Sequence, residues 1–240
     1  MNPARSLALV LLAAAACQRA QASPKPATYP PRWSDQLSLK SLSDVDGEYK
    51  RVDPDEFGDL SKGDARTSPQ TCEQWADLHR RGYEALSTVD AQGDGYARIR
   101  CGTLALLRKV KPAKRGCVRD LPFTDKILSI LPASFASAWS DDEADAVAEA
   151  TKHGKSLRAY DSEVHVLPSK DRGELQIAEA PGKRVSILIS PRAWGDFNGD
   201  EIDDVALSVI NASEGTAAQA RLIVLTCSSP KALLSIISSE

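Results

Sequence analysis

The class of fold follows from VSILI, residues 185–189, in which every second residue is β-branched. Such a run is typical of a β-strand. Similar short runs of aliphatic and β-branched residues lie on both sides of it: residues 164–166, 175–177, 204–210 and 221–226. Turn-forming residues at 170–173 and at Pro181-Gly182 separate the earlier runs. The C-terminal part of the chain is therefore predicted to form short sequential strands.

The residues before Gly154 show a helical period instead. Apolar residues recur at helical spacing in segments that we predict to be helices: residues 72–87, 102–110, 125–131 and 141–153. Capping-box patterns open the first and the last of these, Thr71 with Gln74 and Ser140 with Glu143. Gly154 is a natural C-terminal stop for the last one.

Three other segments carry local signals. Asp90–Gly95 (DAQGDG) is predicted to be a turn, and the basic run Lys109–Arg115 a solvated connector. Pro230 fits the first turn of a short final helix over residues 231–238.

Helices followed by sequential short strands predict an α+β fold. We expect N-terminal helices followed by an antiparallel β-meander and a short C-terminal helix. The domain is expected to span residues 71–240, helical over 71–154 and mainly β over 155–240. The chain has no long internal repeat, which argues against a propeller.

The first residues have the pattern of an export signal. The apolar run from Leu7 to Ala16 is shorter than the roughly 20 residues that a membrane-spanning helix needs. Residues 14–17, Ala-Ala-Ala-Cys, resemble the lipobox of bacterial lipoproteins, which implies a lipid on Cys17. The alternative is cleavage after Ala20-Gln21-Ala22, which would release a secreted or periplasmic protein.

These patterns divide the N-terminal region. We expect residues 1–16 to be the signal peptide and residues 17–70 to be a lipid anchor with a Pro-rich, mostly irregular tether. Gln18 follows the cysteine, and by resemblance to enterobacterial lipoproteins this implies an outer-membrane lipoprotein of the bacterial cell envelope. The expected partners are the membrane, through the N-terminal lipid, and an envelope protein.

Four further cysteines are disulfide candidates: Cys72, Cys101, Cys117 and Cys227. An even number of cysteines in an oxidising compartment predicts disulfides, and three pairings are open. We favour Cys72 with Cys101, because each stands at the start of an apolar helical stretch.

The stretch GDFNGDEIDD, residues 195–204, holds five acidic residues in ten. Counted from Asp196, side chains with oxygen atoms fall at positions 1, 3, 5 and 9, and position 7 offers its backbone carbonyl. Calcium takes six to eight oxygen ligands at about 2.3–2.6 Å. The predicted calcium ligands are Asp196, Asn198, Asp200, the carbonyl of Ile202, and Asp204. The alternative is a plain polar hairpin turn with solvated carboxylates.

This loop resembles the FG-GAP-type loop of integrin α chains and related extracellular bacterial proteins, D-x-N-x-D-G-x-x-D before an apolar strand. The residues DFNGDEIDDVAL match at Asp196, Asn198, Asp200 and Asp204. Glu201 replaces the usual Gly, which is expected to strain a left-handed backbone there. An EF-hand match fails, because Glu201, Asp203 and Leu207 stand where a Gly, an apolar residue and an acid are required. The resemblance implies an ion site, and neither a fold nor an activity.

Composition narrows the remaining function classes. A net charge of −3 disfavours a nucleic-acid partner, and 5% aromatic residues disfavour a stacking platform. The sequence has no catalytic motif of the Gly-x-Ser-x-Gly or His-Glu-x-x-His type, and its three histidines are scattered. We identify no catalytic residue and expect a binding or structural module with a calcium-stabilised loop. The alternatives are an envelope hydrolase using unidentified carboxylates and a periplasmic inhibitor or immunity protein.

Overall fold

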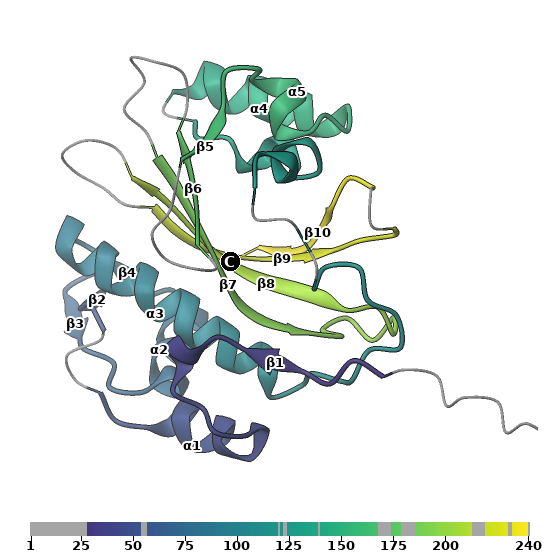
Figure 1. Cartoon of the computed structure of the whole chain (residues 1–240). Helices are drawn as coiled ribbons and strands as arrows, with labels where there is room; N and C mark the ends of the chain where they lie inside the picture. Colours follow the sequence, from purple (N-terminus) through teal and green to yellow (C-terminus); the bar gives the residue numbers. More distant parts are fainter. Residues whose placement is uncertain are drawn as a thin grey trace, which may run out of the picture.

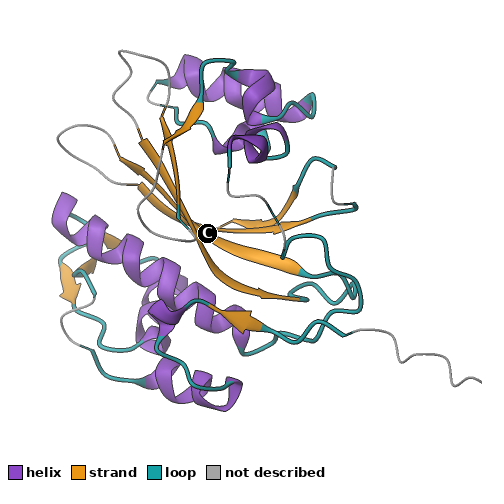
Figure 2. Cartoon of the chain, viewed as in Figure 1, coloured by secondary structure: helices purple, strands orange, loops and turns teal. Residues whose placement is uncertain are grey.

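The framework of the molecule is a seven-stranded antiparallel sheet between two layers of helices (Figures 1 and 2). The computed structural model describes residues 28–53, 57–119, 121, 124–138, 140–167, 174–178, 186–212, 219–229 and 232–239. Six strands neighbour one another in chain order: β5 (His165–Leu167), β6 (Leu175–Ala178), β7 (Ser186–Gly195), β8 (Asp204–Ala212), β9 (Gln219–Thr226) and β10 (Ser235–Ser239). The seventh, β1 (Arg32–Trp33), pairs with the far end of β7.

Both faces of the sheet are buried. Successive side chains of a strand point to opposite faces, so β8 places Val205, Leu207 and Val209 in one apolar core and Ala206 in the other. The first core lies under α4 (Asp141–Lys152) and α5 (Leu157–Tyr160). The second lies between the sheet and α3, which packs against β9 (Figure 1).

The second helical layer comes from the N-terminal half of the described chain. It contains α1 (Val45–Lys50), α2 (Cys72–Arg80) and α3 (Thr88–Leu107). A small sheet in the order β3-β2-β4 lies beside these helices and is made of β2 (Leu60–Lys62), β3 (Ala65–Thr67) and β4 (Glu84–Ala85). Four 3-10 turns complete the elements: η1 (Asp35–Leu37), η2 (Leu42–Asp44), η3 (Asp125–Ser129) and η4 (Ala133–Phe135).

Local capping signals predicted two of the helix starts. The hydroxyl of Thr71 accepts a hydrogen bond from the amide of Gln74 at 3.1 Å, and that of Ser140 accepts one from the amide of Glu143 at 3.2 Å. Gly154 follows α4 with a φ of +64°, a conformation that favours glycine. Each cap depends on residues three positions apart, which is why the sequence reveals it.

The mixed α and β character is confirmed, but the predicted order of elements is not matched. A C-terminal helix over residues 231–238 is wrong, because Ser235–Ser239 form β10 on the edge of β9. Pairing gives the backbone groups of β9 partners that a helix would not supply. At the other end, β1 joins the large sheet, so this sheet is not built from the C-terminal half alone.

The turn predicted at Asp90–Gly95 is also wrong, because these residues lie inside α3. Gly93 and Gly95 allow close packing there. A Cβ on Gly93 would lie 2.6 Å from the backbone nitrogen of Gly58, and one on Gly95 would lie 2.8 Å from the Cβ of Ala220. Glycine thus serves contact between elements here, and its usual association with turns misled the prediction.

The segment predicted as a mostly irregular tether contains regular structure in its described part. It holds β1, α1, β2 and β3 and contributes buried apolar side chains to the second core: Leu37, Val45, Tyr49, Phe57 and Leu60. The predicted third helix at residues 125–131 is the 3-10 turn η3. Within the described ranges, no helix combines the length and the apolar character needed to cross a membrane.

Candidate functional site

The acidic loop, residues 196–204, connects β7 to β8 and rests against residues 109–119, which we call the basic segment. The backbones of Lys111 and Asp196 exchange two hydrogen bonds, at 3.0 and 3.1 Å. The amides of Lys114 and Arg115 both donate to the carbonyl of Glu201, at 2.9 and 3.1 Å. The predicted connector keeps Lys109, Lys111, Lys114 and Arg115 exposed, as expected, while its backbone is docked on the acidic loop.

Two of the five acids are neutralised by this segment. The Nζ of Lys114 lies 2.5 Å from the carboxylate of Glu201, and Arg119 pairs with Asp203 at 2.7 Å. Asp203 is fully buried. Neither Glu201 nor Asp203 belongs to the predicted ligand set. The sequence signal for this contact was a basic run and an acidic run of similar length, about 80 positions apart, with nothing local to connect them.

The predicted ligands turn toward the backbone of their own loop. Asp196 accepts hydrogen bonds from the amides of Gly199 at 2.6 Å and Glu201 at 3.1 Å. Asn198 accepts from the amide of Asp200 at 3.0 Å, and Asp200 accepts from the amide of Ile202 at 2.8 Å. These contacts wind the loop tightly and orient its oxygen atoms.

Glu201 occupies the sixth position of the loop with a φ of +67°. Side chains other than glycine rarely adopt this conformation, which costs on the order of 1 kcal/mol. The strain expected from the sequence at this position is therefore present. The ion pair with Lys114 and the two amide contacts to the Glu201 carbonyl hold the residue in place.

Asp204 is the most deeply buried predicted ligand, with none of its surface exposed. One carboxylate oxygen accepts from the amide of Phe197 at 2.9 Å, while Oδ1 is buried and accepts no well-formed hydrogen bond. Burial raises the pKa of Asp204 to about 6, and the nearby Asp200 and Asp196 act in the same direction. The hydroxyl of Thr226 and the Phe197 amide oppose this shift.

The structure thus brings Asp196, Asn198, Asp200 and Asp204 into one compact loop without gathering them into a ligand cluster. Within the described residues, no group of three or more His, Cys, Asp or Glu side chains is placed to hold a metal ion. The same residues also include no basic side chain in an ion pair with Asp196, Asp200 or Asp204. Ile202 forms a backbone bridge with Arg115.

All four disulfide candidates are paired. Cys72 and Cys101 form one disulfide, with Cα atoms 5.1 Å apart, which joins α2 to α3. This pairing confirms the prediction. Cys117 and Cys227 form the other, with Cα atoms 6.3 Å apart, which joins the basic segment to the end of β9. Cys17, the predicted lipidation site, lies outside the described residues.

A histidine–aspartate pair occurs between α2 and α3. The buried carboxylate of Asp94 contacts the Nε2 of His79 at 2.6 Å, the indole nitrogen of Trp75 at 2.8 Å and Arg98 at 3.0 Å. Burial acts to raise the pKa of Asp94, but the hydrogen bonds from His79 and Trp75 lower it overall. Three donors for one buried carboxylate constitute a structural cross-link between helices.

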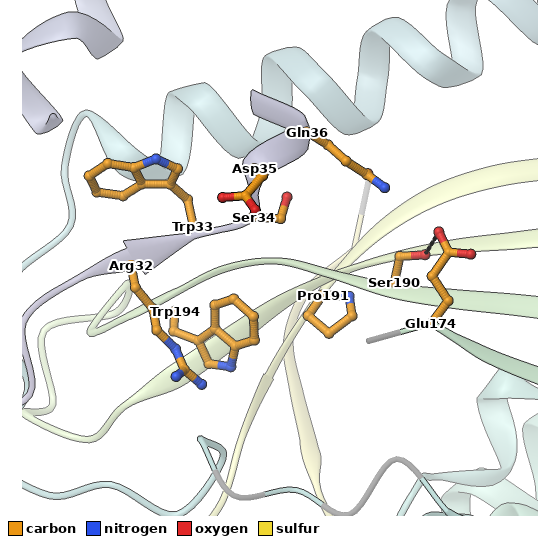
Figure 3. A pocket seen from close by; sticks show the side chains of 9 residues that line it. All are labelled: Arg32, Trp33, Ser34, Asp35, Gln36, Glu174, Ser190, Pro191 and Trp194. Carbon is orange, nitrogen blue, oxygen red and sulfur yellow. Dashed lines mark hydrogen bonds between the residues drawn. The ribbon is translucent and has the colours of Figure 1, made fainter. Parts of the chain in front are cut away.

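A pocket of about 460 Å³ opens where β7 passes from its pairing with β6 to its pairing with β1 (Figure 3). The guanidinium of Arg32 lies 4.1 Å from the ring centroid of Trp194. Ser190 donates to Glu174 at 3.2 Å on the other side of Pro191. The described lining residues include no histidine or cysteine, and the acidic side chains among them are Asp35 and Glu174.

Comparisons of the chain with protein families, with curated proteins and with solved structures found no match.

Proposed function

We propose that this protein is a cell-envelope binding module whose acidic loop is stabilised by calcium and whose N-terminus is anchored through a lipid on Cys17. The observation that carries the calcium proposal is the division of the acidic residues. Lys114 and Arg119 form ion pairs with Glu201 and Asp203, the two acids that do not belong to the predicted ligand set. The carboxylates inside the set form no ion pair with a described basic side chain, and one buried oxygen of Asp204 accepts no well-formed hydrogen bond.

A buried carboxylate without a counter-charge is unfavourable, and a divalent cation is a simple compensation for three close carboxylates. Amide donors on one side of each carboxylate leave further lone pairs for a hard cation. Asp196, Asn198, Asp200 and Asp204 would hold the ion, and the ion would clamp the β7–β8 connection. The role is structural, because a ligand of the folded state raises stability in proportion to its occupancy.

The envelope location is supported by the cysteines. Two disulfides use every cysteine other than Cys17. Disulfides persist mainly in oxidising compartments, such as the bacterial periplasm and the cell surface. Mass spectrometry of the mature N-terminus tests the anchor: a diacyl- or triacyl-modified Cys17 is expected, and an N-terminus at Ser23 would contradict it.

The calcium proposal is tested by the melting temperature with calcium and with EDTA. A calcium-dependent rise is expected in the wild type and is lost in Asp200→Ala. Asp64→Ala removes an exposed acid from the β2–β3 turn and should keep the rise. The absence of both a heat of binding in calorimetry and a rise in melting temperature at saturating calcium would contradict the proposal.

A variant of Lys111 distinguishes a calcium site from a plain polar turn. The Nζ of this lysine lies 4.0 Å from where a Cβ on Gly199 would stand, so it is the basic group nearest to the tip of the loop among the contacts described there. If a cation binds, Lys111→Met removes a competing positive charge and should tighten calcium binding. If Lys111 itself serves as the counter-charge, the same variant lowers stability and leaves the calcium response unchanged.

A further inference from the structure

The face of β9 that lies under α4 contains an arginine in an otherwise apolar pattern. Ile223 and Leu225 of this face belong to the first core. Two residues earlier, Arg221 stands opposite Val209 of β8, another residue of that core. Directly opposed residues of antiparallel strands share a face. Arg221 therefore extends a charged group into the space between the sheet and α4.

This arginine is half-buried and has no counter-charge among the described residues. Its Nε and Nη2 atoms are buried and have no hydrogen-bond partner, and burial lowers the pKa of the guanidinium. No acidic side chain among the described residues forms an ion pair with it. An arginine at the end of a sheet ordinarily extends its guanidinium into water. Here two of its three nitrogen atoms are withdrawn from water, at a cost that an anion would offset.

Arg221 lies in a pocket of about 590 Å³ between α4, η4 and the ends of β8 and β9. Two other buried polar groups of this pocket also lack partners, the side-chain oxygen of Asn211 and the hydroxyl of Ser134. Asn211 is 3% exposed. Ala144 and Ala148 of α4 supply apolar wall. The volume is in the range of small-molecule sites, which combine apolar walls with a few convergent polar groups.

We propose that this pocket binds a small organic acid that carries a hydrogen-bond donor next to its carboxylate and a short aliphatic body. The guanidinium fork of Arg221 matches a carboxylate, and the hydroxyl of Ser134 is a further donor. The oxygen of Asn211 accepts from the neighbouring amino or hydroxyl group of the ligand. The alanine wall contacts the aliphatic body.

A single negative charge fits this pocket best. Arg221 is the only cation with buried nitrogen atoms among the described lining residues, since the side chain of Lys152 at the rim is 74% exposed and lies 3.6 Å from Glu149. The inference rests on the proposed role as a binding module, and it does not depend on calcium. Asn211 is seven residues from Asp204 along β8, or about 23 Å in an extended strand, so the two sites stand at opposite ends.

The test is a titration of the protein with L-valine and with 2-hydroxyisovalerate. Calorimetry and the NMR signal of the Arg221 Nε–H monitor binding, once in the presence of calcium and once in EDTA. Both acids are expected to bind with saturation and to shift this signal, whereas L-valinamide, which lacks the carboxylate, does not. Arg221→Met should weaken binding by at least about thirtyfold. Arg192→Met is the matched control, because Arg192 is also half-buried with a pKa lowered by burial but has Glu174 nearby, and this variant should bind like the wild type.

Stability gives a second readout that does not need a ligand. Arg221→Met replaces an unpaired, half-buried charge with an apolar chain of similar length, so the free protein should melt at a higher temperature. A lower melting temperature would mean that the charge is already paired within the chain and would overturn the inference, as would absence of saturable binding by both acids. Ala148→Trp, on the exposed rim, should block binding with Arg221 intact. A calcium response without acid binding would leave the calcium proposal standing and remove only this one.

Discussion

Arg119 holds Asp203 with two hydrogen bonds, from Nε at 2.7 Å and from Nη2 at 3.0 Å, across 84 positions of sequence. The Asp203 carboxylate is fully buried, and its backbone amide donates to the carbonyl of Arg115 at 2.8 Å. The guanidinium of Arg119 also donates to the carbonyl of Pro30 and lies 5.3 Å from the ring centroid of Tyr29. One ion pair therefore joins the N-terminal segment, the basic segment and the acidic loop.

Asp203→Asn should lower the free energy of unfolding by about 3 kcal/mol, because it leaves the Arg119 charge largely buried without a counter-charge. Urea denaturation measures this loss. Glu149→Gln is the control, since Glu149 pairs with Lys152 on the surface and its loss should change stability by at most about 0.5 kcal/mol. Adding Arg119→Met to Asp203→Asn should recover part of the loss. If Asp203→Asn and Glu149→Gln lower the free energy of unfolding by equal amounts, the buried ion pair between Arg119 and Asp203 does not stabilise the fold as expected.

Glycines in two helices should respond in opposite directions to alanine. In α3, Gly95→Ala places a methyl group 2.8 Å from the Cβ of Ala220 and should destabilise the protein by about 1–3 kcal/mol despite the better helix propensity. In α1, Gly47 has no atom within 4 Å of the same position, and Gly47→Ala should stabilise by about 0.5–1 kcal/mol. Thermal unfolding distinguishes them.

The double variant Gly95→Ala with Ala220→Gly tests the contact itself. It removes the clashing methyl group from β9 and should restore most of the stability lost in Gly95→Ala. If the double variant is no more stable than Gly95→Ala alone, the close approach of α3 to β9 is not the reason for the glycine.

The sequence predicted what depends on neighbouring residues. The runs at 175–177 and 204–210 became β6 and β8 because large apolar side chains recur at every second position in each, and the Thr71 and Ser140 caps need only residues three positions apart. The failures came from distant contacts. The glycines of α3 leave room for the backbone of Gly58 and for the side chain of Ala220. β10 forms because it pairs with the edge of β9.

In the candidate site, too, the features set by neighbouring residues could be predicted from the sequence, and those set by distant contacts could not. The winding of the acidic loop and the left-handed Glu201 follow from the loop sequence alone. Its pairing with Lys114 and Arg119 required knowledge of the fold, as did the position of Arg221 opposite a core valine. A basic residue at the start of the apolar run 221–226 was the signal in the sequence that pointed to Arg221.

The two disulfides should differ in their effect on stability. In the chain-entropy description, a cross-link stabilises more when it closes a longer loop, and the separations here are 29 residues for Cys72–Cys101 and 110 for Cys117–Cys227. Replacing both cysteines of the longer loop with alanine should cost roughly 1 kcal/mol more than the same change in the shorter loop. Denaturant titration of the two double variants measures the difference, and a larger loss from Cys72 and Cys101 would contradict the entropic explanation.

Asp204 should make the metal-free protein less stable as the pH rises from about 4 to about 6. Its pKa is raised from 3.8 to about 6 in the folded state, mainly by burial, so the folded protein binds the proton more tightly than the unfolded chain. The stabilisation is complete below the unfolded pKa and is lost as the pH passes the folded pKa, which amounts to about 3 kcal/mol. Denaturation in EDTA across this range measures the slope, and Asp204→Asn should flatten it and raise stability at pH 7. Calcium should act in the opposite sense and stabilise the wild type more at pH 7 than at pH 4, because a metal ion binds the deprotonated carboxylate. The same pH slope in wild type and Asp204→Asn would show that this carboxylate is not the group responsible.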